Sequence, residues 1–160
     1  MRAVVRSAIV VGVPARVLWD YVTDWPRQGE WIPFTRVEVL PGEGSAHRVG
    51  ARIRAWTGLG RVGFWDPMTV TGWQVEADAA ARCEVLHTGR VVRGDGEFAV
   101  RPLGPHRCEL VWWERLDVPG GVLGALAWRL TGAVFRLGVH QALRRLARRA
   151  ETVHGRGGDG

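Results

Sequence analysis

The sequence has no lysine, only two cysteines and no long uninterrupted apolar run. All 22 basic residues are arginine, which we attribute to a GC-rich genome rather than to function. Cys83 and Cys108 lie in separate apolar stretches without a CxxC spacing or a nearby histidine pair, so we expect two buried free thiols in a reducing cytoplasm. The apolar stretch 122–139 contains Arg129 and Arg136, each costing about 2.5–3.5 kcal/mol at the centre of a bilayer. We therefore expect no membrane span and no stable membrane insertion.

Length and charge indicate one globular domain. The chain has 160 residues and a mass of 17.7 kDa, and we assign the domain to residues 1–154, with a disordered Gly-rich tail at 155–160. The net charge of +6 is uneven, because residues 1–121 hold 15 Arg against 14 acidic residues, whereas 122–160 hold 7 Arg against 2. A nucleic-acid-binding surface would spread its charge differently, so we expect no nucleic-acid partner. The apolar run at 8–13 is too short for a secretory signal, which favours a cytoplasmic location.

Apolar periodicity predicts the order of the elements. Residues 2–13 predict a strand, Pro14 begins a helix at 15–22, and a short second helix or turn carries Trp31. From Phe34 onward, apolar and polar residues alternate, as is typical of strands with one buried face. Six further strands are expected, at 36–39, 48–55, 68–76, 82–87, 91–101 and 107–118.

Two glycine-containing features and one long helix complete the prediction. Asp95-Gly96 predicts a β-bulge or a sharp bend within its strand. A helix is expected at 122–152, with an Arg-rich end that suits the helix dipole. Short connections favour an antiparallel sheet. We expect an α+β helix-grip fold, in which a curved antiparallel sheet of about seven strands wraps round the long C-terminal helix, with two short helices after the first strand. Such packing often leaves a cavity between sheet and helix.

Two segments carry a resemblance to a known family. The segment VPARVLWDYVTD at 13–24 resembles the opening of the SRPBCC superfamily, which includes START-type lipid-binding domains, the birch-pollen allergen fold and polyketide cyclase/dehydrase-like proteins. Asp66-Pro67-Met68 with Trp73, followed by HTGRVVRGDGEF at 87–98, is similar to an actinobacterial subgroup of polyketide cyclase/dehydrase-like proteins. The resemblance covers residues 3–152. It implies a hydrophobic or amphipathic ligand in the cavity but no single reaction, because the superfamily includes carriers, sensors and enzymes.

Candidate ligand contacts are mostly aromatic or apolar side chains on the strands and the long helix, where they could line such a cavity. The apolar candidates are Trp56, Phe64, Trp65, Met68, Trp73, Phe98, Trp112, Leu126 and Leu130, and the polar candidates are His87 and Arg90. The tryptophans on the strands fit a plain hydrophobic core equally well. Adjacent Trp112 and Trp113 must face opposite sides of the sheet, so only one of them can lie inside.

His87 is the ionisable residue of greatest interest, since it ends an apolar strand and titrates near neutral pH. It could orient a ligand or act as a general base, and a purely structural role is the alternative. No Asp or Ser at a recognisable spacing supports a triad, and the side that Glu114 faces depends on which neighbouring tryptophan is inside. The five histidines are too scattered for a metal site, and we expect no cofactor.

The string GLGRVG at 58–63 matches a dinucleotide-binding GxGxxG pattern, but a strand rather than a helix follows it. We favour a mobile loop at 57–66 that gates the cavity, with a plain hairpin turn as the alternative.

These patterns predict a protein that binds a hydrophobic or amphipathic small molecule, such as a lipid, sterol or polyketide, between the sheet and the long helix. The enzyme alternative is a polyketide cyclase or dehydratase, which needs two or more ionisable groups converging in the cavity. Only His87 is a clear candidate in the sequence, which favours binding without chemistry. A third possibility is an interaction module whose cavity is filled by its own tryptophans. If the sheet leaves the apolar first half of the helix uncovered, a homodimer becomes possible.

Overall fold

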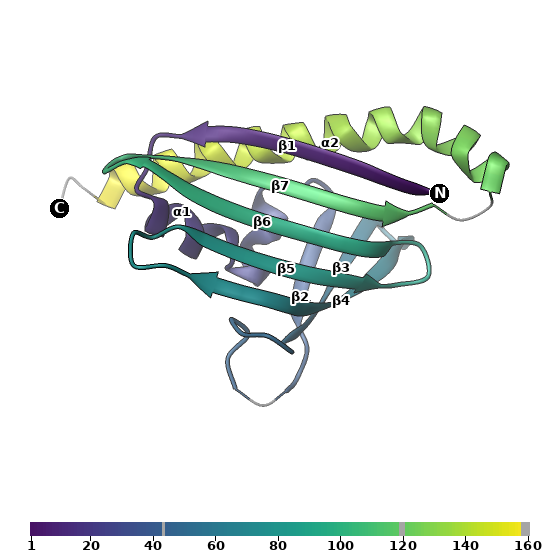
Figure 1. Cartoon of the computed structure of the whole chain (residues 1–160), viewed down its shortest axis with the longest axis horizontal. Helices are drawn as coiled ribbons and strands as arrows, with labels where there is room; N and C mark the ends of the chain where they lie inside the picture. Colours follow the sequence, from purple (N-terminus) through teal and green to yellow (C-terminus); the bar gives the residue numbers. More distant parts are fainter. Residues whose placement is uncertain (43, 119–120, 158–160) are drawn as a thin grey trace.

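Seven antiparallel strands form one curved sheet around the helices (Figure 1). They are β1 (Arg2–Val11), β2 (Thr35–Val39), β3 (Arg52–Leu59), β4 (Val62–Val75), β5 (Ala81–Thr88), β6 (Arg93–Gly104) and β7 (Arg107–Asp117). The strand order across the sheet is β1-β7-β6-β5-β4-β3-β2. The computed structural model describes residues 1–42, 44–118 and 121–157; the side chains of 121–125, 127, 130, 156 and 157 lie outside the described set. The expected antiparallel sheet is confirmed.

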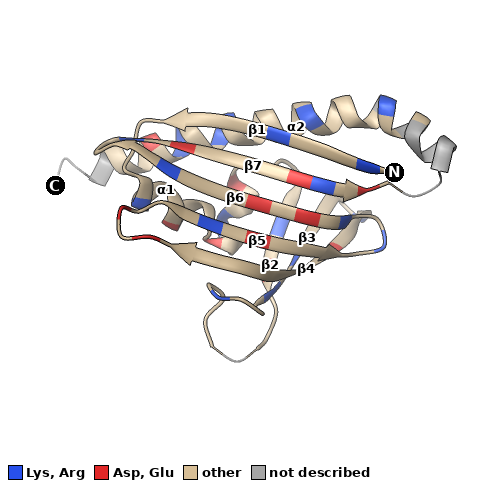
Figure 2. Cartoon of the chain, in the orientation of Figure 1, with Lys and Arg blue, Asp and Glu red and all other residues tan. Residues whose placement is uncertain are grey.

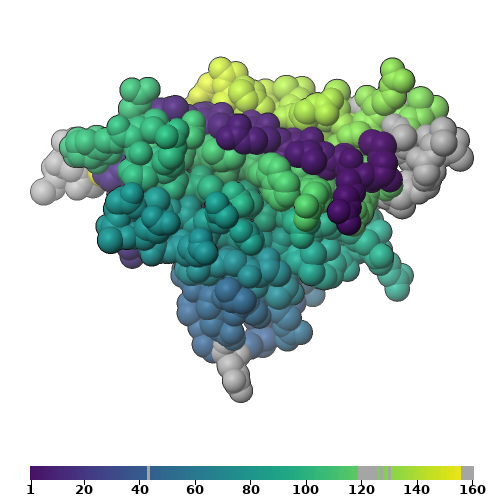
Figure 3. All heavy atoms as spheres, in the orientation of Figure 1, coloured from purple at the N-terminus to yellow at the C-terminus, as the bar shows by residue number. Residues whose placement is uncertain are grey.

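Two short helices and one long helix pack on this sheet. They are α1 (Ala15–Val22), the 3-10 helix η1 (Trp25–Glu30) and α2 (Gly121–Gly157). The α+β helix-grip fold is therefore the observed fold. The helix α2 continues through residues 155–157, where a tail was expected, and residues 158–160 lie outside the described chain. In the space-filling view, β1 and α2 form one edge of the molecule, and the segment around residues 40–60 protrudes at the opposite edge (Figure 3).

Alternation along each strand defines a concave face turned to the helices and a convex face turned to solvent. On β3, Ile53 and Ala55 are buried in the core, whereas Arg52 and Arg54, which alternate with them, reach the convex side. Because successive side chains point to opposite faces, one buried residue fixes the direction of every other residue in the same unbroken strand.

The segment formed by α1 and η1 fills one half of the concave face. Trp31, which follows η1, has no exposed surface, and its ring packs edge-on against Phe98 and Trp112 at centroid distances of 6.1 and 6.0 Å. The segment is held by Glu30, which accepts hydrogen bonds of 2.9 Å from Tyr21 Oη and 2.9 Å from Arg27 Nε. Apolar burial and these polar ties together fix the aromatic side chains.

The two halves of α2 have different surroundings. In the second half, Leu143 and Leu146 are fully buried in the core. In the first half, Leu126 and Val134 are 58% and 71% exposed. Figure 2 shows basic residues along much of this helix, while acidic residues lie on strands such as β6 and β7. The apolar first half is thus only partly used by the fold.

Two expectations about glycine-rich segments are corrected. The β6 ladder runs without interruption through Asp95 and Gly96, so the expected bulge is absent there; register shifts occur instead at Val70/Gly72 and Pro102/Gly104. The segment 57–66, for which we favoured a mobile gating loop, is a β-hairpin in which Leu59 pairs with Val62. A plain hairpin turn was the alternative expectation. Gly60 at φ 58° supplies the left-handed turn residue.

Candidate ligand-binding site

Three ionisable side chains meet on the concave face, one each from β4, β5 and β7. The His87 imidazole lies between two carboxylates: Nδ1 is 2.8 Å from Asp66 Oδ2, and Nε2 is 3.2 Å from Glu114 Oε2. The exposed fractions of the His87, Asp66 and Glu114 side chains are 7%, 10% and 8%. We call these three residues the charged cluster.

Strand periodicity explains why the three side chains share one face. Asp66 lies two residues before Met68, and Glu114 lies four residues after Leu110; both Met68 and Leu110 belong to the core. His87 pairs with Met68 in the β4–β5 ladder and therefore points the same way. Trp112 is thus the inward member of its pair, and Glu114 faces inward with it.

Glycines on β6 provide the space that the cluster needs. This strand runs between β5 and β7, with Gly94 opposite His87 and Gly96 opposite Glu114. A Cβ atom on Gly96 would lie 2.9 Å from both His87 Nε2 and Glu114 Oε2. Gly94 has φ 132°, and a Cβ there would lie 1.9 Å from the backbone oxygen of Arg115. The imidazole and the carboxylate can meet across β6 because Gly96 has no side chain, whereas the missing side chain of Gly94 lets the backbones of β6 and β7 approach each other.

The environment of His87 favours its protonated form. Burial by itself would lower the pKa of His87, but the hydrogen bond to Asp66 and the close, negatively charged carboxylates of Asp66 and Glu114 outweigh burial and raise it from 6.5 to about 10. At neutral pH the ring is therefore an imidazolium that donates from Nδ1 to Asp66. The general-base role considered for this histidine does not fit this state, whereas a proton-donor role does.

The protein satisfies only part of the cluster's hydrogen-bonding capacity. Glu114 Oε1 accepts a hydrogen bond of 2.6 Å from Trp112 Nε1. Asp66 Oδ1 and Glu114 Oε2 are buried without a hydrogen-bond donor among the described residues, because His87 Nε2 is close to Glu114 Oε2 but poorly aligned with it. Burying an ionised oxygen without a donor is costly. The site thus holds two acceptor atoms, and the donor His87 Nε2, that its own fold leaves unpaired.

The family model "Polyketide cyclase / dehydrase and lipid transport" matches residues 2–151, which is nearly the whole chain. The chain belongs to this family. No curated protein matches the sequence significantly. The family resemblance inferred from segments 13–24 and 87–98 is therefore confirmed.

Several solved structures share this fold at low sequence identity. The Zhui aromatase/cyclase from a Streptomyces species is 19% identical, with 94% of each chain covered and a TM-score of 0.73. A START superfamily protein from Mycobacterium smegmatis is 16% identical, with 94% of this chain and 98% of that chain covered and a TM-score of 0.71. Human STARD10 is 10% identical, with 92% of this chain and 62% of that chain covered and a TM-score of 0.71. At these identities the likeness shows the fold alone.

Several predicted contacts of this polyketide cyclase/dehydrase-family chain gather on the concave face with the charged cluster. Phe64 and Met68 share the face of Asp66 on β4. Phe98 packs against Trp112 at a centroid distance of 5.1 Å. These four residues and His87 form a continuous inner surface, apolar except at the cluster.

Trp73 also faces inward, but at a different place. Its ring stacks on His47 at 5.2 Å and packs against Trp19 at 5.2 Å. Trp73 lines a surface pocket of ≈ 320 Å³ beside α1, together with Arg16 and Thr23. None of the charged cluster lines this pocket, so Trp73 belongs to a separate part of the face.

Trp56 and Trp65 lie on the convex face, opposite the core-facing Ala55 and Asp66. The two indoles pair across β3 and β4 at 5.5 Å, and the guanidinium of Arg54 lies 4.2 Å from the Trp65 ring. The structure does not bring these two predicted contacts to the inner surface. They form a layer of aromatic and arginine side chains on the convex face instead.

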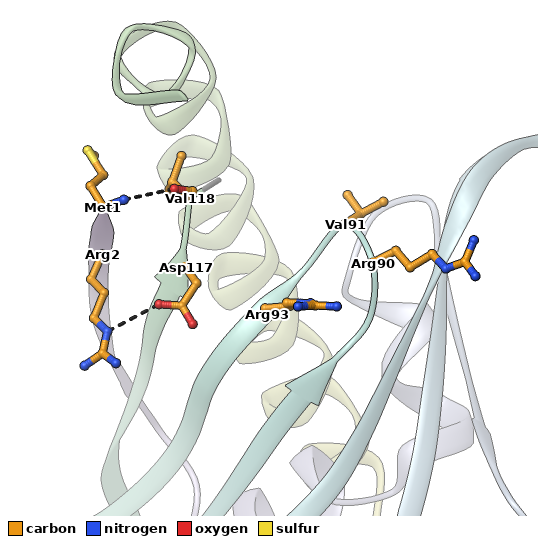
Figure 4. Close-up of a pocket in the computed structure, with 7 residues that line it drawn as sticks. All are labelled: Met1, Arg2, Arg90, Val91, Arg93, Asp117 and Val118. Atoms are coloured by element: carbon orange, nitrogen blue, oxygen red, sulfur yellow. Dashed lines mark hydrogen bonds and ion pairs between the residues drawn. The ribbon is translucent and has the colours of Figure 1, made fainter. Parts of the chain in front are cut away.

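The remaining predicted contacts lie at the start of α2 and at the end of the sheet. Arg90 is exposed on the β5–β6 connection and lines a pocket of ≈ 520 Å³, where its side chain points away from the ends of β1 and β7 (Figure 4). The other lining residues are Met1, Arg2, Val91, Arg93, Asp117 and Val118. Leu126 is exposed on the outer side of α2, and the side chain of Leu130 lies outside the described residues.

No group of three or more His, Cys, Asp and Glu in the described parts of the chain could hold a metal ion. In the charged cluster, each ring nitrogen of His87 faces a different carboxylate, so the side chains share no coordination point. Burial raises the pKa of the Cys83 thiol to about 12 and that of Cys108 to about 11, so both stay protonated near neutral pH. Within the described residues, no helix is long and apolar enough to cross a membrane.

Sequence reasoning missed Asp66 and could not orient Glu114. Asp66 was expected to precede the strand, because the alternation was read only from residue 68 onward, whereas β4 begins at Val62. The alternation of Asp66 with Met68 and Val70 was the available signal. Gly96 was read as a bulge because glycine in a strand has both meanings, and only the neighbouring strands distinguish them.

Proposed function

We propose that this protein binds a hydrophobic or amphipathic small molecule, of lipid, sterol or polyketide type, between the concave face of the sheet and the first half of α2. The observation that carries the proposal is the charged cluster, an incompletely satisfied group of charges on an otherwise apolar inner surface. Ligand sites commonly combine apolar walls with a few polar groups that fix orientation. Membership of a lipid-transport and cyclase family supports the same ligand class.

The burial of α2 supports the proposed location. Val139, Leu143 and Leu146 form the stripe of the helix that is buried in the fold. Helical spacing extends the same stripe to Trp128 and Phe135, which are only half-buried. A stripe that is covered at one end and partly open at the other leaves apolar surface for a ligand near the start of the helix.

A titration with the neutral fluorescent probe N-phenyl-1-naphthylamine tests this site. Phe135→Ser removes an apolar wall, and we expect it to weaken probe binding by about 1–2 kcal/mol, roughly five- to thirtyfold. Leu137→Ser is the matched control, because Leu137 is 58% exposed on the other side of the same helix. We expect this control to bind the probe like the unmodified protein. Equal binding by all three proteins would place the ligand elsewhere.

Native mass spectrometry of the purified protein gives an independent test. A small molecule that is lost on denaturation would identify the ligand by its mass. The same spectrum reports whether the chain is a monomer or a homodimer, which bears on the exposed apolar residues of α2.

The buried free thiols Cys83 and Cys108 support a reducing compartment such as the cytoplasm.

The second candidate function is cyclisation or dehydration of a polyketide. Three ionisable side chains converge in the structure, whereas the sequence alone indicated only one clear candidate, and this convergence favours an enzyme. In a dehydration, Glu114 would accept the proton from the carbon next to the carbonyl, while protonated His87 would donate a proton to the departing hydroxyl. A carbon–carbon double bond forms and water leaves. The acid and base sit side by side, as such a step requires.

An absorbance assay with an aromatic β-hydroxy ketone separates this enzyme from a pure carrier, because the conjugated product absorbs light differently. Catalysis predicts dehydration above the buffer rate that falls about a hundredfold or more in Glu114→Gln, since general acid–base groups contribute about that much. A rate equal to that in buffer, in a protein that binds the ketone, would leave the carrier function standing and eliminate this reaction.

A further inference from the structure

The charged cluster also indicates which chemical group the ligand carries at one end, in addition to the hydrophobic character of the ligand as a whole. From its unpaired oxygens and its charge, we infer that the end of the ligand held there is a hydrogen-bond donor, a hydroxyl or a protonated amine, and not a carboxylate or phosphate. This inference rests on the proposed function and adds the chemistry of the head group to it.

Two of the three unpaired atoms in the cluster are acceptors, and the third is His87 Nε2. Asp66 Oδ1 and Glu114 Oε2 are both buried without a hydrogen-bond donor, on side chains that are about nine-tenths buried. A carboxylate oxygen has no proton to give, so a ligand can satisfy it only by donating one. A hydroxyl or an ammonium group provides such donors, whereas an ionised acid provides none.

The charge of the cluster points in the same direction. Two carboxylates flank one imidazolium, so with all three ionised the cluster has a net charge of −1. No arginine among the described residues forms an ion pair with Asp66 or Glu114; Arg115 on β7 pairs with Asp95 on the convex side instead. An anionic head group would therefore meet net repulsion in a poorly solvated place.

Gly96 lets the two poorly aligned atoms of the cluster lie close to its backbone. The position of its absent Cβ is 2.9 Å from His87 Nε2 and 2.9 Å from Glu114 Oε2, the two atoms that lie close without good hydrogen-bond geometry. If a purely structural ion pair were the purpose, better alignment of these atoms would be expected. The loose pairing suits a site in which a third group completes the hydrogen bonds.

The test uses three ligands with the same decyl chain and different heads: decylammonium, decanol and decanoate. Each is titrated against bound N-phenyl-1-naphthylamine at neutral pH. Because hydrogen bonds to charged groups contribute more than neutral ones, we expect decylammonium to displace the probe at about tenfold lower concentration than decanoate, with decanol in between. Glu114→Gln removes one negative charge and should reduce this preference.

Glu97→Gln is the matched control, since Glu97 lies on the convex side of β6 near Arg82 and its replacement should leave the preference unchanged. Displacement that is equal for the three heads, or strongest for decanoate, overturns the inference while leaving hydrophobic binding intact. Failure of the probe to bind at all overturns both. The comparison of heads in the unmodified protein decides the matter even if Glu114→Gln does not fold.

Discussion

The two halves of the concave face bury different kinds of side chain: aromatic rings in one half and charged groups in the other. Beside α1 and η1, the Trp31 ring packs edge-on against Phe98 and Trp112, which are tilted to each other, and apolar contact accounts for most of that region. Toward the β5–β6 connection, the same sheet buries Asp66 and His87 with a second carboxylate, although charged groups are expensive to bury. The first half is packed as core and borders the second through the hydrogen bond from Trp112 to Glu114, and the second half has properties that stability alone would not select.

The contrast teaches that burial and function can be separated on one surface. A buried ion cluster is often no more stable than apolar residues of similar volume. Retaining one with two acceptor atoms unpaired therefore indicates a use for those atoms. The aromatic half also buries one unpaired polar atom, Trp31 Nε1, but that atom belongs to a neutral ring that fills space and excludes water.

The largest effect is expected in the aromatic half. Trp31→Ala removes a side chain with no exposed surface and leaves a cavity between η1 and the sheet. We expect the free energy of unfolding to fall by about 3–5 kcal/mol, measured by urea denaturation. A loss below about 1 kcal/mol would show that this half is not a tightly packed core.

In the charged half, His87→Leu leaves two carboxylates facing each other without their cation. We expect the free energy of unfolding to fall by about 3–5 kcal/mol, which equals or is slightly less than the effect of Trp31→Ala. Combining it with Asp66→Asn and Glu114→Gln removes the charges as well, so stability should return to near its original value. That triple variant should nevertheless lose the preference for decylammonium. If it remained as unstable as His87→Leu, a structural role for the cluster would be the better account.

The pH dependence of stability sharpens the comparison further. The pKa of His87 is about 10 in the folded protein and 6.5 in the unfolded chain, so the stabilisation that His87 provides is fully present below about pH 6.5 and is lost as pH rises through about 10. Unfolding between about pH 6.5 and 8.5 should show stability decreasing by up to about 1.4 kcal/mol per pH unit. The triple variant should be nearly flat there. This window stops below the ordinary thiol pKa of 9.0, so Cys83 does not contribute.

The smallest effect is expected on the convex face, outside both halves. Arg54 lies over the Trp65 ring and forms a 2.7 Å ion pair with Glu38, but both charged side chains are about 40% exposed, at 42% and 40%. Arg54→Ala should cost only about 0.5–1 kcal/mol in urea denaturation and should not alter probe binding. A change in ligand affinity would return Trp56 and Trp65 to the candidate site.

Much of the fold could be predicted because its signals are local. The helix at Ala15–Val22 follows Pro14, and the strands show alternation that a reader can follow without the structure. The candidate site was less accessible. His87 was recognised, but its partners Asp66 and Glu114 lie 21 and 27 positions away along the chain, and no short motif joins them. The direction of Glu114 depended on the register of β7, which the neighbouring strand and the packing of Trp112 decide.

By itself, the sequence determined the class of fold, the order of the elements and the apolar character of the inner surface, because periodicity and turn chemistry act over a few residues. Only the tertiary structure decided which tryptophans face inward, that Gly96 is a gap rather than a bulge, and that an imidazolium lies between two carboxylates. These features arise from strands that are neighbours in the sheet but distant in the chain. Their energies depend on burial and on separations of a few ångströms, which exist only once the sheet has formed.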